Sequence, residues 1–312
     1  MAARARNKAK NTSKPKKKSS IGKKQKILGP ELFVGLVGAV GTDLGLVADQ
    51  LAQELRGANY FPEIIRLSAL IADSAKYAHL KKLDRDPEDN RVNAYMDAGD
   101  ELRRTMLRGD AAALLAISKV QALRVEKNGD GSTPIPRAAY IFNSLKHPNE
   151  VSTLREIYGD SFLLIAAYSP RETRLRQLSD RIARSRKDYK PDQYLDAAVK
   201  LNERDEQEAG DDYGQSVRET FPLADVFVDA SDSDALHGHL KRLIDILFSY
   251  PYSTPTVDEY GMFHAKAAAL RSADLSRQVG AVIASEAGEI ISTGCNEVPS
   301  AGGGAVWEGR LA

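Results

Sequence analysis

The sequence predicts an α/β protein with a doubly wound parallel sheet, followed by a smaller unit of one helix and a β-hairpin. Residues 31–37 (ELFVGLV) and 161–168 (SFLLIAAY) are apolar almost throughout, which is typical of strands covered on both faces in a parallel sheet. Strand-like and helix-like segments also alternate along the chain, as they do in doubly wound folds. We therefore expect Leu32–Val37 and residues 162–167 to be central strands.

The first strand is followed by a glycine-rich turn, residues 38–41, and then by a helix. Thr42 and Asp43 can cap this helix, which is predicted to run to about Arg56. Its apolar residues fall on one face at helical spacing: Leu44, Val47, Ala48, Leu51 and Leu55. The same patterns predict further helices over residues 92–108, 111–126, 148–157, 171–187 and 235–248, and further strands over residues 138–142 and 224–229.

A second unit is predicted to begin at a linker, residues 250–255 (YPYSTP). A helix over residues 256–272 is followed by strands 278–285 and 289–293, which form a hairpin around a Gly-containing turn. One helix and one hairpin make a small core, so we expect this unit to be part of a larger domain. The predicted organisation is a tail at 1–27, a first domain at 28–250 and a second at 251–312.

Charge is unevenly distributed along the chain. Residues 1–27 contain 11 Lys and Arg and no acidic residue, so the remainder carries 33 basic against 43 acidic residues. Such a tail buries too little apolar surface to fold, and we expect it to be disordered, either as a solubilising tail or as a weak attraction for nucleic acid. The single cysteine, Cys295, and the lack of a long apolar run or a signal sequence indicate a cytoplasmic protein without membrane contact.

The glycine-rich turn occupies the place of a phosphate-binding loop. Such a loop has the pattern G-x-x-x-x-G-K-[ST], in which backbone N–H groups surround the phosphate and the lysine neutralises it. Counting from Gly38, Asp43 replaces the second glycine, Leu44 the lysine, and Gly45 the hydroxyl residue. Because Asp43 would repel phosphate, we do not expect a nucleotide to bind there. The degenerate loop consists of Gly38, Gly41, Thr42 and Asp43, and a turn without a ligand and a regulatory nucleotide site both stay open.

With this motif degraded, residues 28–248 resemble the P-loop nucleotide kinases. The resemblance implies that arginines of the basic segment 171–187 fall where those kinases carry phosphate-contacting arginines in a lid. These residues are Arg171, Arg174, Arg181 and Arg184. A charged surface helix would explain the same residues, so both interpretations stay open.

A more specific signal lies in residues 271–299. The runs RSADLSRQVGAVI (271–283) and EIISTGCNEVP (289–299) resemble the first helix and first two strands of the deoxycytidylate deaminase family. The resemblance implies that Asn296 faces the sugar of a nucleotide and that Arg277 or Arg271 lies near its phosphates. The alternatives are a turn role for Asn296 and surface or ion-pair roles for the two arginines.

Deaminases of this family hold a catalytic Zn²⁺ with one His and two Cys, in the signature H-x-E followed by P-C-x-x-C. The chain contains His264-Ala-Lys266, with Lys in place of the Glu, and its one cysteine directly precedes Asn296. We therefore expect no metal ligands and no catalytic residues in this chain. We further expect the catalytic half, with its zinc site, to lie beyond Ala312.

Together the two parts resemble bacterial anti-phage deaminases of dCTP and dCMP, in which a P-loop-kinase-like domain precedes the deaminase domain. The resemblance implies zinc-dependent deamination of deoxycytidine nucleotides, depletion of that pool during infection, restraint by a regulatory RNA or inhibitor, and a homo-oligomer. Two alternatives stay open: a nucleotide kinase, against which Leu44 argues, and a non-catalytic nucleotide sensor. The sequence does not distinguish dCMP from dCTP as the substrate.

Overall fold

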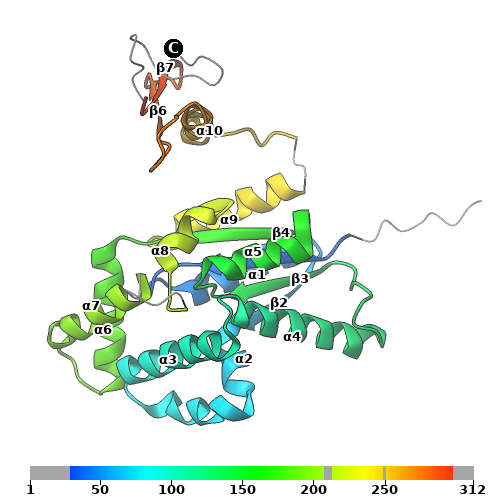
Figure 1. Cartoon of the computed structure of the whole chain (residues 1–312), viewed down its shortest axis with the longest axis vertical. Coiled ribbons are helices and arrows are strands. Elements are labelled where there is room, and N and C mark those ends of the chain that lie inside the picture. The colour runs from blue at the N-terminus through cyan, green and yellow to red at the C-terminus, as the bar shows by residue number, and fades with distance from the viewer. Residues whose placement is uncertain (1–28, 207–212, 249–250, 298–312) are drawn as a thin grey trace, which may run out of the picture.

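The computed structural model describes residues 29–206, 213–248 and 251–297. Its main feature is a sheet of five parallel strands in the order β2-β3-β1-β4-β5 (Figure 1). The strands are β1 (Leu32–Val37), β2 (Phe61–Arg66), β3 (Ala138–Asn143), β4 (Phe162–Tyr168) and β5 (Val226–Asp229). In the described part of the chain, no helix is both long and apolar enough to cross a membrane.

Helices cover both faces of the sheet. On one face, α1 (Leu44–Gly57) and α9 (Ser233–Leu247) bury Leu51, Leu240 and their neighbours against alternate side chains of β1 and β4. On the other face, α4 (Ala111–Asn128) and α5 (Pro148–Tyr158) pack against the remaining side chains. Each central strand therefore has two apolar faces, because a layer of helices excludes water from both sides. The predicted doubly wound α/β fold is confirmed, and β1 and β4 are interior strands as predicted.

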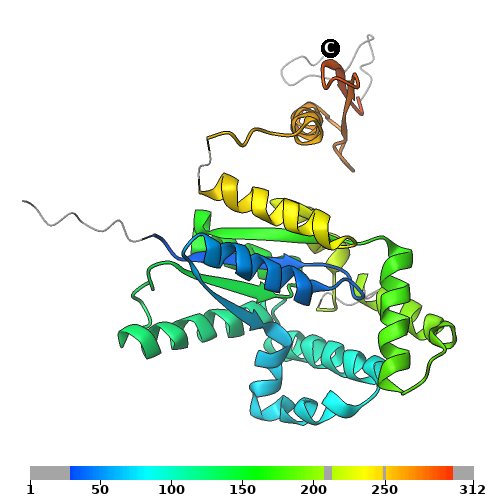
Figure 2. The ribbon, with the colours of Figure 1, turned by 180° about the vertical axis from the view of Figure 1, so that it is seen from behind.

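Two further groups of helices lie near one end of the sheet, beyond the carboxyl ends of its strands. One group, α2 (Leu67–Asp73), the 3₁₀ segment η1 (Ala75–Arg85) and α3 (Glu88–Met106), follows β2 and forms its own small core. A second group, α6 (Arg171–Ser185), η3 (Pro191–Tyr194) and α7 (Leu195–Glu206), packs against α3. Short segments η2 (Gly159–Ser161), α8 (Val217–Thr220) and η4 (Phe221–Leu223) complete the connections. The two views show both groups beyond the same end of the sheet (Figures 1 and 2).

Several elements were not predicted from the sequence, among them β2, α2, η1 and α7. Strand β2 (FPEIIR) alternates exposed and covered residues and contains Pro62. It is an edge strand, where a proline can be accommodated because one side of the strand needs no ladder hydrogen bonds. Helix α7 is likewise absent from the prediction, although its residues Ala198 and Leu201 are buried.

The last described residues form α10 (Val257–Ala269) and a hairpin of β6 (Gly280–Ala284) and β7 (Ile290–Cys295), as predicted. Arg242 on α9 links this unit to the first through an ion pair with Glu259. Ile283 and Ile291 on the hairpin are more than 60 % exposed, as expected for a hairpin without further strands beside it. The predicted basic tail, residues 1–27, lies outside the described residues.

Candidate functional site

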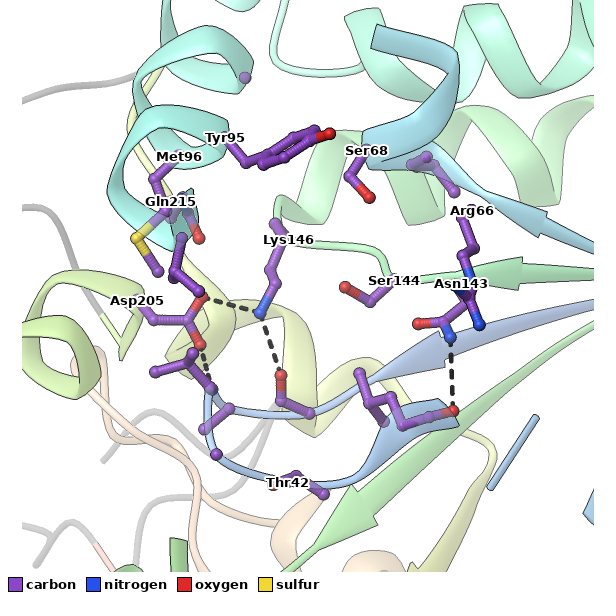
Figure 3. Close-up of a pocket in the computed structure, with 18 of the residues that line it drawn as sticks. Thr42, Arg66, Ser68, Tyr95, Met96, Asn143, Ser144, Lys146, Asp205 and Gln215 are labelled. Atoms are coloured by element: carbon purple, nitrogen blue, oxygen red, sulfur yellow. Dashed lines mark hydrogen bonds and ion pairs between the residues drawn. The ribbon is translucent and has the colours of Figure 1, made fainter. Parts of the chain in front are cut away.

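A cavity of about 420 Å³ lies at the carboxyl ends of β1, β2 and β3, between the glycine-rich turn and helix α3 (Figure 3). Ligands of open α/β sheets bind at this edge, because the loops leaving adjacent strands diverge there. Tyr95 and Met96 of α3 form the wall opposite the turn, and Ser68 and Ser144 contribute hydroxyl groups (Figure 3). This is the larger of the two cavities that the turn borders, and it is called the loop cavity below.

The glycine-rich turn holds a conformation that requires glycine at one position. Gly41 has φ +96°, and a Cβ atom there would lie 2.6 Å from the carbonyl oxygen of Arg174 on α6. An L-residue is disfavoured both by this φ and by the contact with α6. The turn therefore packs closely against α6. This contact and the positive φ explain why the turn needs glycine at position 41, as predicted.

Asp43 is the N-cap of α1, as the sequence predicted. Its Oδ1 accepts a hydrogen bond of 2.9 Å from the backbone N–H of Leu46. In a working phosphate loop, this N-terminus would interact with the phosphate. Here the carboxylate of Asp43 accepts the hydrogen bond from this end of the helix. Its negative charge also offsets the partial positive charge of the helix N-terminus.

A second carboxylate occupies the turn from the other side. Asp205, at the end of α7 and fully buried, accepts a hydrogen bond of 2.6 Å from the backbone N–H of Val40. Its other oxygen lies 2.7 Å from Nζ of Lys146, which also donates to the carbonyl oxygen of Gly38 at 3.2 Å (Figure 3). The turn thus has a lysine after all, contributed by the segment between β3 and α5, but that lysine neutralises a protein carboxylate.

Behind the loop cavity lies a buried ionic group. Glu150 accepts hydrogen bonds from the backbone N–H groups of Lys146 and His147, at 2.7 and 3.2 Å, and Arg103 lies 3.7 Å from its other oxygen. Burial raises the pKa of Glu150, and the charge of Arg103 opposes that rise. Arg103 also pairs with Asp100 at 2.6 Å, so its charge is shared between two carboxylates and is not free for a ligand.

Two guanidinium groups at this cavity have no partner among the described residues. Arg66, at the end of β2, and Arg181, on α6, both line the cavity and are exposed. Within the described residues, neither has a hydrogen bond or an ion pair. Arg91 also lines it, but this side chain is paired with Glu88 at 2.7 Å. Arg66 and Arg181 are thus the cations that an anionic ligand could reach.

The four arginines predicted to act as a lid have different positions. Arg181 reaches the loop cavity, whereas Arg184 is exposed and lines no cavity described here. Arg174 is buried and pairs with Glu206 at 3.2 Å. Arg171 lies 3.7 Å from a carboxylate oxygen of Glu203 on the surface. One of the four is therefore placed to contact a ligand here.

The residues predicted for substrate binding are in the second unit and do not line the loop cavity. The contacts of Asn296 and Arg271 join them to other residues of that unit. Asn296 accepts from the backbone N–H of Val279 at 2.8 Å and donates to the carbonyl oxygen of Arg277 at 2.6 Å, which joins the two ends of the hairpin. Arg271 forms an ion pair with Glu297. The side chain of Arg277 is exposed. Their roles toward a nucleotide stay predictions.

The described residues do not fit a zinc site. No group of three or more His, Cys, Asp or Glu side chains among residues 29–206, 213–248 and 251–297 is arranged to hold a metal ion. The thiol of Cys295 accepts from Arg271 at 3.6 Å, and His264 packs edge-on against Tyr260. A catalytic zinc site needs about three protein ligands, and the described residues do not supply them.

Comparison with known proteins does not establish a family for this chain. No family model matches the chain. UPF0200 proteins from two strains of Halobacterium salinarum are 30% identical over 105 residues, which is 33% of this chain and 48% of each relative. The chain therefore spans about half the length of the curated relatives it matches.

Solved structures that resemble this chain include a gluconokinase and a shikimate kinase, both at low similarity. A gluconokinase from Sinorhizobium meliloti 1021 matches with a TM-score of 0.33 and 14% identity over 72% of this chain and 98% of that chain. A shikimate kinase from Aquifex aeolicus matches with a TM-score of 0.34 and 11% identity over 72% of this chain and 100% of that chain. Scores of this size carry no argument about activity. With its parallel sheet, helices on both faces and glycine-rich turn between β1 and α1, the first domain has a doubly wound α/β fold.

Proposed function

We propose that the first domain binds a nucleotide in the loop cavity and senses it without transferring a phosphoryl group. The observation that carries this proposal is a pair of guanidinium groups, Arg66 and Arg181, that have no partner among the described residues. They lie at a cavity beside the turn, where Asp205 binds the N–H of Val40 and Asp43 caps α1. The cavity can attract a phosphate through its arginines, while the turn itself cannot accept one.

The shape and lining of the cavity suit a nucleotide. Its volume of about 420 Å³ falls within the ~300–1,000 Å³ usual for small-molecule sites. Tyr95 presents an aromatic ring against which a base could stack, and Ser68 and Ser144 present hydroxyl groups for the sugar or the base edge (Figure 3). Arginine is the preferred partner of a phosphate, since its planar fork donates two parallel hydrogen bonds.

Binding without transfer follows from the occupants of the turn. Phosphoryl transfer needs donors and a cation around the phosphates of ATP. Here Val40 N–H and the α1 N-terminus bind carboxylates, and Lys146 is held by Asp205. For ATP phosphates to enter, Asp205 would have to leave a position where it is fully buried. A regulatory site is therefore favoured over a kinase.

Calorimetric titration of this chain with dCMP, dCTP, AMP and ATP tests the proposal. At least one nucleotide should bind, and Arg66→Ala and Arg181→Ala should each weaken it about tenfold or more, because each removes a charge-assisted hydrogen bond. Arg176→Ala is the matched control, an exposed arginine of α6 that lines no cavity described here. If no nucleotide bound, or if both variants bound as tightly as the control, the proposal would be wrong.

A second candidate function, zinc-dependent deamination of deoxycytidine nucleotides in anti-phage defence, is supported by residues 271–299 and by the exposed hairpin. Ile283 and Ile291 leave apolar surface uncovered on a two-stranded sheet, which is typical of a part of a larger α/β sheet. The test is zinc analysis and a deaminase assay on the natural gene product with dCMP and dCTP. Zinc at one per chain together with turnover would support this candidate, and the absence of both would remove it.

A further inference from the structure

Helices α3 and α6 each contribute one of the groups on which the proposed nucleotide site depends. Tyr95 of α3 is the aromatic wall of the loop cavity, and Arg181 of α6 is one of its two cations without a partner among the described residues. A ligand that stacks on Tyr95 and binds Arg181 through its phosphate must span both helices. The alignment of these two helices therefore decides how well such a ligand fits.

The two helices are joined by polar contacts outside the loop cavity. At the start of α3, the backbone N–H of Glu88 donates to Oγ of Ser185, the last residue of α6, at 2.8 Å. The next residue, Asp89, accepts from one nitrogen of Arg186 with both carboxylate oxygens, at 2.7 and 2.9 Å. Asp89, Ser185 and Arg186 do not line the loop cavity. We call these four residues the α3–α6 clasp.

The charges of the clasp suit the helix ends on which they lie. Asp89 is in the first turn of α3, where the helix dipole favours a negative charge. Arg186 directly follows the last residue of α6, where the dipole favours a positive charge. Their side chains are 16% and 34% exposed, so solvent screens the pair only in part. Cζ of Arg186 also lies 5.7 Å from the centre of the Tyr194 ring, which supports the guanidinium group from a second side.

The first turn of α3 is also connected to Tyr95. Glu88 accepts from Nε and Nη2 of Arg91, at 3.0 and 2.7 Å. Cζ of Arg91 lies over the Tyr95 ring, 5.9 Å from its centre, within the range of a cation–π contact. The clasp, Arg91 and Tyr95 thus form one connected series of contacts from the end of α6 to the wall of the cavity.

Apolar contacts also hold the two helices together, but they do not fix the alignment by themselves. Met96 of α3 packs with Leu178 and Ile182 of α6 in one buried cluster. Such contacts are non-directional, so neighbouring alignments of the helices bury similar apolar area. An ion pair and a hydrogen bond need specific distances and angles, and they therefore select one alignment.

We propose that Asp89 and Arg186 are positioning residues, which hold Tyr95 and Arg181 in the alignment that a nucleotide requires. The role given to them rests on the proposed function of the loop cavity. It adds a requirement on the ligand, which must carry an aromatic base and a phosphate in one molecule. A sugar phosphate without a base would reach the arginines but would not depend on the alignment of α3 with α6.

Calorimetric titration of the whole chain with dCMP, dCTP, AMP, ATP and ribose 5-phosphate tests the positioning role. Asp89→Ala and Arg186→Ala should each weaken nucleotide binding about fivefold, because a partly exposed ion pair changes an equilibrium constant by no more than about that factor. The affinity for ribose 5-phosphate should stay the same in both variants, since this ligand has no base to place against Tyr95. The double variant should bind nucleotide no more weakly than either single variant, because both substitutions remove the same interaction.

Arg171→Ala is the matched control. It breaks another ion pair of α6, with Glu203 on α7 at 3.7 Å, and should leave nucleotide binding unchanged because that pair does not involve α3. Clasp variants that bound nucleotide as tightly as this control would overturn the positioning role, and so would an equal loss of affinity for ribose 5-phosphate. If the alanine variants did not fold, Asp89→Asn, which removes the charge and keeps the size of the side chain, would decide the question.

The same titrations separate this role from the proposed function. If nucleotides bind and depend on Arg66 and Arg181 but not on Asp89 or Arg186, the positioning role alone is wrong. If no nucleotide binds to the unmodified chain, both the proposed function and the positioning role are wrong.

Discussion

Lys146 and Asp205, 59 residues apart in the sequence, form a 2.7 Å ion pair beside the glycine-rich turn. Asp205 also binds the backbone N–H of Val40, and Lys146 binds the carbonyl oxygen of Gly38. The pair therefore holds the turn from both sides with the protein's own charges. It also joins three segments that are separate in the sequence: the turn after β1, the segment after β3, and α7.

Breaking this pair should destabilise the domain. Asp205→Asn leaves Lys146 without its counter-charge, and removing one partner of a buried pair costs about 3–5 kcal/mol. Because the Lys146 side chain is 22% exposed, we expect about 3 kcal/mol by urea denaturation. Asp97→Asn, which removes an exposed partner of Arg204, is the control and should cost less than about 1 kcal/mol. Equal losses in the two variants would contradict the role given to Asp205.

Restoring the missing lysine of the phosphate-loop pattern should not create a kinase. In Leu44→Lys, Asp43 still caps α1 and Asp205 still accepts from the N–H of Val40. Neither the helix N-terminus nor this N–H is then available to the phosphates of ATP. We expect no ADP formation above the unmodified chain, with or without dCMP as acceptor. Magnesium-dependent ADP release by this variant would show that the carboxylates are readily displaced.

Gly41 in the turn and Gly57 at the far end of α1 should respond to alanine with opposite signs. Gly41→Ala places a methyl group 2.6 Å from the carbonyl oxygen of Arg174 at φ +96°, and we expect a loss of about 2 kcal/mol or more. Gly57→Ala, in the last turn of α1, meets nothing within 4 Å and should stabilise by up to about 1 kcal/mol. Thermal unfolding of the two variants measures both values. Stabilisation by Gly41→Ala would show that the turn is not locked against α6.

Asp110 should make the domain sensitive to acid. Hydrogen bonds from Arg108 at 2.7 Å, and then from Thr153 at 2.6 Å, hold the pKa of this carboxyl below its ordinary value although burial opposes them. A lowered folded-state pKa means that this stabilisation is present above the unfolded-state pKa of about 3.9 and is lost as pH falls through the folded-state value.

The variant Asp110→Asn removes the titrating group. Compared at about pH 6 and pH 3 by urea denaturation, it should lose less stability on acidification than the unmodified chain. The difference should be small, because Arg108 is 53% exposed and solvent screens its charge. If the two proteins lost equal stability between these pH values, Asp110 would not contribute to the loss of stability in acid.

The 312-residue chain should bind no stoichiometric zinc and should not deaminate dCMP or dCTP. It has one thiol, Cys295, and the zinc site of these deaminases needs two Cys beside one His. Without zinc, the water that attacks the cytosine ring keeps its ordinary high pKa and is a weak nucleophile at neutral pH. Metal analysis beside a deaminase assay measures both. Zinc at one per chain, or turnover, would contradict the ligand argument.

Local sequence patterns predicted most of the fold. Uniformly apolar runs identified β1 and β4 as central strands, and helical spacing located α1, because both patterns reflect which faces of an element are buried. The cap at Asp43 was also readable, since an N-cap bonds within a few residues of itself. Strand β2 was missed because an edge strand with a proline has too weak a pattern.

The candidate site was decided mostly by tertiary structure. The sequence located the turn and showed that its lysine position is Leu44, but Lys146 and Asp205 carry no motif that assigns them to it. Patterns of burial are periodic and local, so a sequence reveals them directly. Which side chains meet across 59 or more residues depends on how the strands pair and the helices dock, and that is settled only when the whole chain is packed.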